Sequence, residues 1–355
     1  MNLFEKMVEE LKISNLPTIL YGSGVLSVMV DAYLEENGIV VAGFVVDQEY
    51  YKESAHNGKP VYILSDYVTK NSCNIVLAFS YLSIEWENKL RSLVASKPDT
   101  KIYLLDFQAY LALPGNHRSY ESFYRENRQI LEELRNQLCD GNSKKALDDF
   151  IEQKLTGIYR KPCSDGAAFF DSDVIKFSEN EVYVDCGAYN GDTVIGFAEN
   201  LKRNGIDSYG KIYAFEADIQ NVHDMGENLK GYDNVEVIAK GVYDRARIMR
   251  FIAEGTAGSH ISDEGVEIEV TSIDEAIKGG GVTFIKMDIE GSELMALKGA
   301  EQTIRRFKPK LAICVYHRVE DLITIPQYIK SLNPDYNLYF RKYWPNAVDA
   351  VLYAI

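Results

Sequence analysis

The sequence contains few of the spacings that mark the commoner metal and phosphate sites. Its 5 Cys and 5 His include no C-x-x-C or H-x-x-x-H pair, so we do not expect a structural zinc site. A phosphate-binding loop is also absent, because no G-x-x-x-x-G-K-[ST] segment occurs. The odd number of cysteines and their wide spacing are typical of reduced cytoplasmic thiols.

Positive charge and long apolar runs are scarce as well. The chain has 38 Lys and Arg against 53 Asp and Glu, a net charge of −15, which argues against a nucleic-acid partner. Apolar runs such as IVVAGFVV at 39–46 are too short to span a membrane. The start, MNLFEKMVEE, lacks the apolar core of a signal peptide. A 355-residue chain with 46% hydrophobic residues therefore favours a cytoplasmic α/β protein of two domains.

Short β-branched runs that alternate with helical stretches predict a small Rossmann-like α/β domain over residues 1–112. Residues 113–170 read as a helical linker and lead-in, because ESFYRENRQILEELRNQL and SKKALDDFIEQKL place apolar residues at helical spacing. A second sheet is expected over residues 171–355. Its expected strands are EVYVDCG, KIYAFEA, VEVIAKG, VTFIKMD, KLAICVYH, YNLYFRK and DAVLYAI.

The order of these seven strands predicts the architecture of the second domain. Helical segments separate the first five strands, apart from an inserted hairpin made of IMRFIAE and VEIEVTSI. The last two strands are close in sequence, which favours an antiparallel pair at one edge. Five parallel strands with an antiparallel edge hairpin are the layout of the class I methyltransferase fold.

An acidic glycine turn follows the first of these strands in VYVDCGAYNGDTV, 182–194. Tyr189 and Asp192 stand where a dinucleotide fingerprint needs glycine. Asp185 and Asp192 would repel a pyrophosphate and would favour a cation, such as the amino group and sulfonium of S-adenosylmethionine. Taken alone, the segment could also be only a tight turn. We predict cofactor contacts from Asp185, Gly187, Ala188, Tyr189, Asn190, Gly191, Asp192 and Thr193.

Acidic residues also follow the next two strands. Glu216, with Ala217 beside it, is placed to accept hydrogen bonds from both hydroxyls of an unphosphorylated ribose. Asp244 in GVYD is placed to reach an adenine amino group. An acid after each of three successive strands favours a bound adenosyl nucleoside.

The segment VTFIKMDIEGSELMALKGAEQTIRRFKPKLAICVYHR, 282–318, resembles the FkbM-type methyltransferase family. DCGAYNGDT, AFEAD and the GSHIS-type loop match that family in order. The resemblance covers about residues 170–355. It implies an S-adenosylmethionine-dependent enzyme that methylates hydroxyls of sugars, glycans or related metabolites, as in surface polysaccharide biosynthesis. It also suggests substrate contacts from Ser259 and His260, although the residues alone favour an ordinary hairpin loop there.

Three polar residues follow the fourth and fifth strands. Asp288 and His317 are expected at the strand ends, facing one crevice, and either could remove the acceptor's proton as general base. Asp288 could instead orient the acceptor or the methionine amino group, and His317 could be a structural residue. Glu290, on the turn, is a candidate substrate contact. These three residues could also ligate a divalent ion, but their spacing is not distinctive, so we expect no metal.

The N-terminal unit has its own Gly22–Ser23–Gly24 turn, followed by a helix and a strand that ends at Asp47. Ser27 replaces the third glycine of a dinucleotide fingerprint. Residues 18–110 resemble the N-terminal nucleotide-sugar-binding domain of PglD-type sugar acetyltransferases. This unit could therefore hold a nucleotide-linked sugar, or act as a scaffold for a homodimer.

A non-catalytic nucleotide-sugar-binding or scaffold protein with a decayed methyltransferase domain is the alternative for the whole chain. The intact set of Asp185, Gly187, Glu216 and Asp288 argues against decay.

Overall fold

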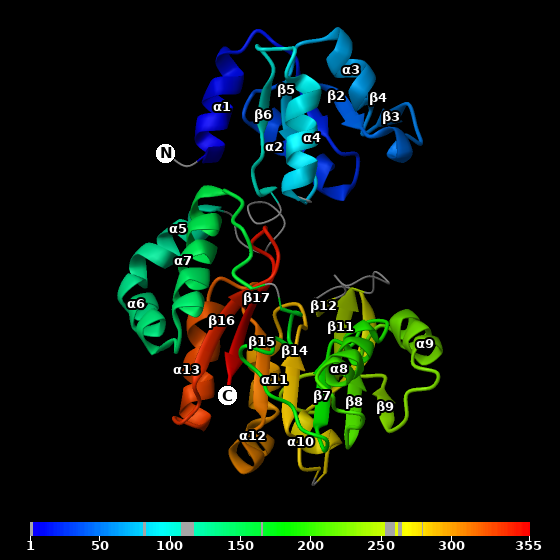
Figure 1. Cartoon of the computed structure of the whole chain (residues 1–355), viewed down its shortest axis with the longest axis vertical. Helices are drawn as coiled ribbons and strands as arrows, with labels where there is room; N and C mark the ends of the chain where they lie inside the picture. The colour runs from blue at the N-terminus through cyan, green and yellow to red at the C-terminus, as the bar shows by residue number, and fades with distance from the viewer. Residues whose placement is uncertain are drawn as a thin grey trace. The chain divides into compact units, whose positions relative to one another are not determined.

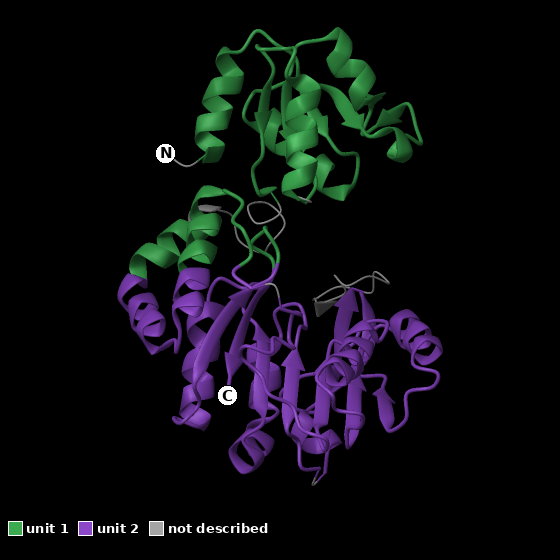
Figure 2. Ribbon diagram, in the orientation of Figure 1, with its two compact units in different colours: residues 1–126, 148–162, 344–348 green, residues 127–147, 163–343, 349–355 purple. Residues whose placement is uncertain are grey.

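The computed structural model describes residues 3–80, 83–107, 117–164, 166–252, 260–261, 265–278 and 280–355. The chain forms two compact units, which Figure 2 colours separately. Unit 1 comprises residues 1–126, 148–162 and 344–348, and unit 2 comprises residues 127–147, 163–343 and 349–355. The segment 113–170, expected to be one linker, thus contributes to both units.

Unit 1 contains a six-stranded sheet in the order β3-β4-β2-β1-β5-β6 (Figure 1). All neighbouring pairs are parallel except β3 and β4. Successive residues of β1 serve opposite faces of the sheet, because Leu20 belongs to one core cluster and Ile19 to the other. A parallel sheet with a core on both faces confirms the predicted Rossmann-like class. The elements before residue 112 are α1 (Leu3–Ile13), β1 (Thr18–Tyr21), α2 (Val25–Glu36), β2 (Val41–Val46), η1 (Gln48–Tyr50), β3 (Ala55–His56), β4 (Lys59–Ile63), α3 (Leu64–Lys70), β5 (Asn74–Leu77), α4 (Ile84–Val94) and β6 (Lys101–Tyr103).

Unit 2 contains a seven-stranded sheet in the order β16-β17-β15-β14-β7-β8-β9. β17 runs antiparallel to both β15 and β16, and the pairs from β15 to β9 are parallel. This arrangement confirms the predicted class I methyltransferase layout with its edge hairpin. The strands are β7 (Val182–Cys186), β8 (Lys211–Phe215), β9 (Val235–Ile238), β14 (Phe284–Met287), β15 (Lys310–Cys314), β16 (Leu338–Lys342) and β17 (Ala350–Ala354).

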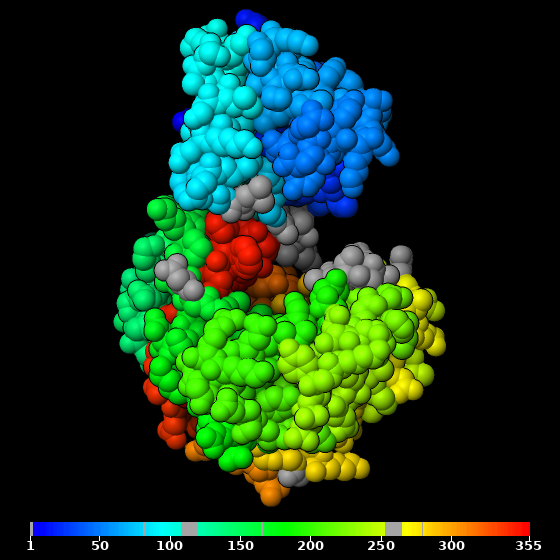
Figure 3. Space-filling model, turned by 45° about the vertical axis from the view of Figure 1, so that its right-hand side comes forward, coloured from blue at the N-terminus to red at the C-terminus, as the bar shows by residue number. Residues whose placement is uncertain are grey.

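Helices cover both faces of this sheet. The chain progresses from β7 toward β9 in one direction and from β14 toward β15 in the other, so right-handed crossovers place the two sets of helices on opposite faces. α8 (Asp192–Arg203) and α9 (Ile219–Asn228) belong to the first set, and their green to yellow-green segments form much of the surface seen in Figure 3. α11 (Glu293–Lys298), α12 (Glu301–Phe307) and α13 (Asp321–Leu332) belong to the second set, in which α13 packs against the other two. The direction reverses between β7 and β14, where open α/β sheets bind ligands at the strands' carboxyl ends.

Aromatic side chains fill the core under α8. Tyr183 of β7 stacks on Phe284 of β14, with ring centroids 4.9 Å apart, and Phe197 of α8 lies 4.6 Å from Tyr183. All three side chains are fully buried. Large rings in β7 and β14 therefore fix the helix over the point where the strand order reverses.

The predicted insertion is confirmed as a separate four-stranded sheet in the order β10-β13-β11-β12. β11 and β13 form its antiparallel pair. Ser259 lies outside the described residues. His260 pairs with Ile252 through the backbone, and its side chain is not described. The elements of the insertion are β10 (Gly241–Val242), β11 (Arg247–Ile252), β12 (His260–Ile261), β13 (Val266–Thr271) and α10 (Ile273–Ala276).

The described residues of the lead-in form three helices: α5 (His117–Glu126), α6 (Arg128–Gln137) and α7 (Gly141–Thr156).

No helix within the described part of the chain is long and apolar enough to cross a membrane.

Arg341 of β16 fixes the start of α7 to the sheet. Its guanidinium donates hydrogen bonds to Asp140 Oδ2 at 2.7 Å and to Ser143 Oγ at 2.6 Å, and its side chain is 2% exposed. Burial opposes ionisation of Asp140, but the hydrogen bonds from Arg341 and Ser143 outweigh it and lower the pKa of Asp140 to about 2. A carboxyl whose pKa is lowered by folding stabilises the native state at pH values above its ordinary pKa of 3.8. That stabilisation is lost as the pH falls toward 2.

We predict that Arg341→Met destabilises unit 2 by about 1.5–3 kcal/mol at pH 7, because it removes charged hydrogen bonds from a buried guanidinium to Asp140, which is 35% exposed. Urea unfolding of the full chain, followed by circular dichroism, measures this loss. Arg203→Met is the control, since Arg203 pairs with Glu199 on the surface of α8 and should change stability by less than ~1 kcal/mol. Equal losses in the two variants would contradict the assignment. The difference in unfolding free energy between the wild type and Arg341→Met should also become smaller below about pH 4, as Asp140 is protonated.

Candidate functional site

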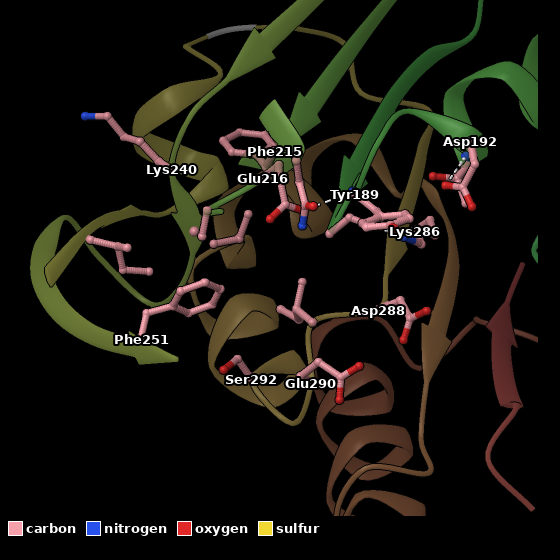
Figure 4. A pocket seen from close by; sticks show the side chains of 18 of the residues that line it. Tyr189, Asp192, Phe215, Glu216, Lys240, Phe251, Lys286, Asp288, Glu290 and Ser292 are labelled. Atoms are coloured by element: carbon pink, nitrogen blue, oxygen red, sulfur yellow. Dashed lines mark hydrogen bonds between the residues drawn. The ribbon is translucent and has the colours of Figure 1, made fainter. Parts of the chain in front are cut away.

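A cavity of about 230 Å³ lies at the carboxyl ends of β7, β8 and β14. In Figure 4, Phe251 lies toward one side, Asp192, Lys286 and Asp288 toward the other, and Glu216 between them. We call the end with Asp192, Lys286 and Asp288 the charged end and the end with Phe251 the apolar end; Lys240 also lies on the Phe251 side, with its amino group directed away from the cavity. Its lining residues are Phe169, Gly187, Tyr189, Asp192, Thr193, Phe215, Glu216, Ala217, Asn221, Lys240, Gly241, Val242, Phe251, Ile268, Lys286, Asp288, Ile289, Glu290, Ser292 and Tyr316.

The glycine turn after β7 forms one wall. Gly187 has φ +79°, and a Cβ atom at this position would lie 2.0 Å from the Asp288 carbonyl oxygen, so only glycine fits. Its backbone N–H donates to Phe215 O at 3.1 Å, as does that of Ala188 at 3.0 Å. The turn is therefore fixed to β8 and pressed against the end of β14.

The predicted turn residues divide into two groups. Gly187, Tyr189, Asp192 and Thr193 line the cavity. The remaining predicted residues of the turn, Ala188, Asn190 and Gly191, are not among its lining residues.

Asp185 lies beneath the cavity and does not line it. Its fully buried carboxylate forms an ion pair with Lys286 Nζ at 3.0 Å and accepts a hydrogen bond from Thr193 Oγ1. Lys286 Nζ also donates to Gly187 O at 2.6 Å. Burial opposes protonation of Lys286, but the carboxylates of Asp185 and Asp288 outweigh it and raise the pKa of the ammonium. Asp185 therefore neutralises a buried lysine, and it is Lys286 that reaches the cavity wall.

Glu216 occupies the middle of the cavity wall and is 8% exposed. Tyr189 N–H donates to its Oε2 at 2.9 Å, drawn as a dashed line in Figure 4, and Asp218 N–H donates to its Oε1 at 2.8 Å. Burial nevertheless raises the pKa of this carboxyl. The Asn221 side chain and the Ala217 backbone also hydrogen-bond to this carboxylate, which lines the cavity.

Carboxylates dominate the charged end. Asp288 follows β14 directly and accepts a hydrogen bond from Tyr316 OH at 3.2 Å. Burial opposes ionisation of Asp288, but the charges of Lys286 and His317 outweigh it and lower its pKa. Glu290 lies on the following turn and also lines the cavity. Asp288 is therefore ionised near neutral pH.

His317 does not face the cavity as predicted. β15 ends at Cys314, so His317 lies three residues beyond the strand, and its side chain is 4% exposed. It faces Glu293 through Nδ1, and Asp288 and Glu290 through Nε2. Burial opposes its protonation, but these carboxylates, Glu293 first, raise the pKa of the imidazole well above its ordinary value. His317 is buried and does not line the cavity, so Asp288 is the one of the two candidate bases with access to a ligand there.

Asp244 also lies apart from this cavity. Its carboxylate is 3.3 Å from the Arg247 guanidinium, and it lines a separate depression with Ser272 and Arg305. β9 ends at Ile238, and the chain reaches the cavity at residues 240–242, before Asp244. Lys240, Gly241 and Val242 therefore occupy the place that the sequence assigned to Asp244.

Several lining residues were missed by the sequence analysis. Lys286 could have been found, because a lysine in the apolar run VTFIKMD needs a buried partner, and Asp185 is its counterpart in VYVDC. Phe251 and Ile268 come from the inserted sheet, and their positions depend on how that sheet folds over the strand ends. Phe169 precedes the domain's first strand and gave no periodic signal.

We predict that Lys286→Met destabilises unit 2 by about 3–5 kcal/mol, because it leaves the Asp185 carboxylate buried without its counter-charge. The double variant Asp185→Asn/Lys286→Met should recover part of that loss, since it removes both charges. Urea unfolding of the full chain measures both values. If the double variant lost as much unfolding free energy as the two single variants lose together, the two side chains would act independently.

Residues 185–339 match the family model for the methyltransferase FkbM domain. No curated protein matches the chain. The structure is similar to the crystal structure of methyltransferase FkbM from Methylobacillus flagellatus KT, with a TM-score of 0.75 and 24% identity over 99% of this chain and 93% of that one. This likeness shows the fold.

Two further solved structures are more distant. An rRNA methylase from Streptococcus thermophilus has a TM-score of 0.34 and 18% identity over 52% of this chain and 90% of that one. Aeropyrum pernix fibrillarin, with natively bound S-adenosyl-L-methionine, has a TM-score of 0.33 and 15% identity over 51% of this chain and 70% of that one. The chain thus carries, at residues 185–339, a domain that matches the FkbM methyltransferase family, and this match on a methyltransferase fold supports a methyltransferase.

Proposed function

We propose that unit 2 is an S-adenosylmethionine-dependent O-methyltransferase acting on a hydroxyl of a sugar, glycan or related metabolite. The observation that carries this proposal is the order of groups along the cavity (Figure 4). An apolar end with Phe251 is followed by the Glu216 carboxylate and then by the carboxylates of Asp192 and Asp288. Adenine, ribose and a cationic methionine group follow one another in the same order.

The apolar end suits a purine ring. Val242, Phe251 and Ile268 line it, and they can cover the faces of a flat aromatic base. Glu216 follows, and its carboxylate lines the cavity as an acceptor for the hydroxyls of an unphosphorylated ribose. A ribose phosphate would meet a carboxylate at this point and would be repelled.

The charged end suits a cation. Lys240 and Lys286 also line the cavity, but Lys240 Nζ lies 2.6 Å from Glu269 and Lys286 Nζ lies 3.0 Å from Asp185. Both lysine charges are therefore offset by acidic residues that do not line the cavity. The carboxylates of the cavity wall then give the cavity a negative electrostatic potential. A sulfonium and an amino group are stabilised in such a field, whereas a pyrophosphate is not.

The reaction requires an electrophilic methyl group, which S-adenosylmethionine supplies when bound. Asp288 lies at the charged end, where it can orient the acceptor hydroxyl and accept its proton as the new carbon–oxygen bond forms. S-adenosylmethionine would supply the methyl group and leave as the neutral thioether. Holding the acceptor oxygen in line with the methyl group and sulfur would supply much of the rate. Glu290 and Tyr316 line the cavity beside Asp288, and Ser292 lines it nearer Phe251 (Figure 4). All three offer hydrogen-bonding groups to a polyhydroxylated acceptor.

The N-terminal unit is proposed either to hold a nucleotide-linked sugar or to act as a scaffold for a homodimer. The first role is supported by the Gly22–Ser23–Gly24 turn after β1, next to the point where the strand order reverses between β1 and β5. Asp47 follows β2 and accepts a hydrogen bond from Tyr21 OH.

We predict that S-adenosylhomocysteine binds the full chain, and that Glu216→Gln weakens this binding by about 10- to 100-fold. A charged acceptor contributes about 1.5–3 kcal/mol to a hydrogen bond, and the amide would also turn a donor toward the backbone N–H groups of Tyr189 and Asp218. Isothermal titration calorimetry measures the affinity. Glu227→Gln, at an exposed site on α9, should leave it unchanged. Preferential binding of NAD would contradict the proposal, and no binding of either nucleotide would favour a decayed domain.

We also predict that cells without the gene lose a methyl group from a sugar-containing metabolite or glycan, which mass spectrometry detects. Complementation with the wild-type gene should restore the group. Asp288→Asn should lower methyl transfer by about 100-fold or more, because the amide accepts no proton. Calorimetry must first confirm that this variant still binds the cofactor product. Full methylation by a cofactor-binding Asp288→Asn protein would remove Asp288 as the proton acceptor.

A further inference from the structure

The buried His317 side chain has carboxylates at both ring nitrogens. Nδ1 lies 2.9 Å from Glu293 Oε1, whereas Nε2 lies 3.5 Å from Asp288 Oδ1 and 3.4 Å from Glu290 Oε2. His317 is 4% exposed and Glu293 is fully buried. Neither ring nitrogen makes a hydrogen bond of good geometry, and Glu293 Oε2 has no hydrogen-bond partner. Buried polar atoms normally have such partners, so this cluster lacks a group that would satisfy it.

The two distances at Nε2 suit ligands that share one cation. Nitrogen and oxygen ligands lie about 2.1 Å from ions such as Zn²⁺ or Mg²⁺. Two such ligands are therefore about 3.0 Å apart at a right angle and about 3.4 Å apart at a tetrahedral angle. A direct N–H···O hydrogen bond is shorter, at about 2.9 Å. The separations of 3.4 and 3.5 Å at Nε2 match a shared ion better than a hydrogen bond.

The opposite side of the ring has the usual surroundings of a metal ligand. A ligating histidine commonly presents its second nitrogen to a carboxylate, which fixes the orientation of the ring. Glu293 occupies that place, and its Oε1 is itself held by a hydrogen bond from Ile289 N–H at 2.9 Å. Asp288, Glu293 and His317 each offer one ligand atom within 4.8 Å of the others, and Glu290 joins this group only through its contact with His317 Nε2. Nδ1 of the imidazole thus lies beside the Glu293 carboxylate, and Nε2 is directed toward Asp288 and Glu290.

The cluster is closed on the protein side and open on the cavity side. His317 and Glu293 are buried, whereas Asp288 and Glu290 are about one-third exposed and line the cavity. Catalytic metal sites keep such an open side for water or substrate. From the sequence we expected no metal, because the spacing of Asp288, Glu290 and His317 is not distinctive. The distances at Nε2 favour a cation site instead.

We propose that His317 Nε2, Asp288 and Glu290 bind one first-row divalent cation, with Glu293 orienting the imidazole. One imidazole and two carboxylates suit an ion such as Mn²⁺. Its open coordination positions face the cavity, where hydroxyl oxygens of the acceptor can bind. Coordination would make a bound hydroxyl a better nucleophile, because the ion would stabilise the oxygen as its proton passes to the Asp288 carboxylate. This catalytic role rests on the proposed methyl transfer, whereas the cation site itself does not.

The test is a Mn²⁺ titration of the full chain without nucleotide, in which electron paramagnetic resonance measures free Mn²⁺. We expect one equivalent to bind, and Asp288→Asn and Glu290→Gln each to raise the dissociation constant by about 10-fold or more. Asp192→Asn is the matched control. It removes a carboxylate from the same cavity but no ligand, so it should change the constant by less than about threefold. Absence of saturable binding, or equal weakening by all three variants, would overturn the proposal.

A second measurement does not depend on the folding of any variant. Electron spin-echo spectroscopy of Mn²⁺ bound to the wild-type chain should show coupling to an imidazole nitrogen, and its absence would rule out His317 as a ligand. The coupling should persist in His223→Gln, at an exposed site on α9, and disappear in His317→Gln if that variant folds. Calorimetry with S-adenosylhomocysteine on the same preparation separates the two proposals. Nucleotide binding without Mn²⁺ binding defeats the cation site alone, and the reverse result defeats the methyltransferase assignment alone.

Discussion

The buried ion pair between Asp185 and Lys286 is the interaction on which the site depends. The two residues are register partners on β7 and β14, the strands between which the sheet order reverses. Lys286 also binds the carbonyl oxygen of Gly187, so one ammonium group joins both strands to the turn above them. The turn has little freedom, because Gly187 leaves no room for a side chain against Asp288. The pair therefore places the glycine turn and the end of β14 at a fixed separation across the cavity floor.

Carboxylates of the same chemistry take different roles here because their surroundings differ. Asp185 is fully buried and is balanced by a lysine. Glu216 is nearly buried, accepts hydrogen bonds from backbone N–H groups and from Asn221, and lines the cavity. Asp288 is one-third exposed and remains ionised beside Lys286 and His317. An excess of negative charge on the wall thus coexists with a stable fold, since the fully buried carboxylate of Asp185 beneath the wall is paired with Lys286.

The sequence predicted the sheet and part of the site well, and the reasons are local. Apolar runs defined β7, β8 and β14, and Glu216 lines the cavity because it directly follows the end of β8. Asp244 and His317 were misplaced because both lie beyond a strand end, where turns rather than strand direction decide which way a side chain points. The Asp185–Lys286 pair was predictable from two charged residues in apolar strands. Phe251 was not, because it enters from the inserted sheet.

Two non-glycine residues at the cavity have left-handed backbone conformations. Tyr189 has φ +47° and Glu290 has φ +53°, and each lies between or beside glycines that adopt such angles readily. A residue with a side chain costs about 1–3 kcal/mol in this region, a cost that glycine would avoid. Both side chains line the cavity, one on the turn after β7 and one on the turn after β14. Strain of this kind persists where the surrounding structure enforces it, and here it brings an aromatic ring and a carboxylate to the two walls that a ligand would contact.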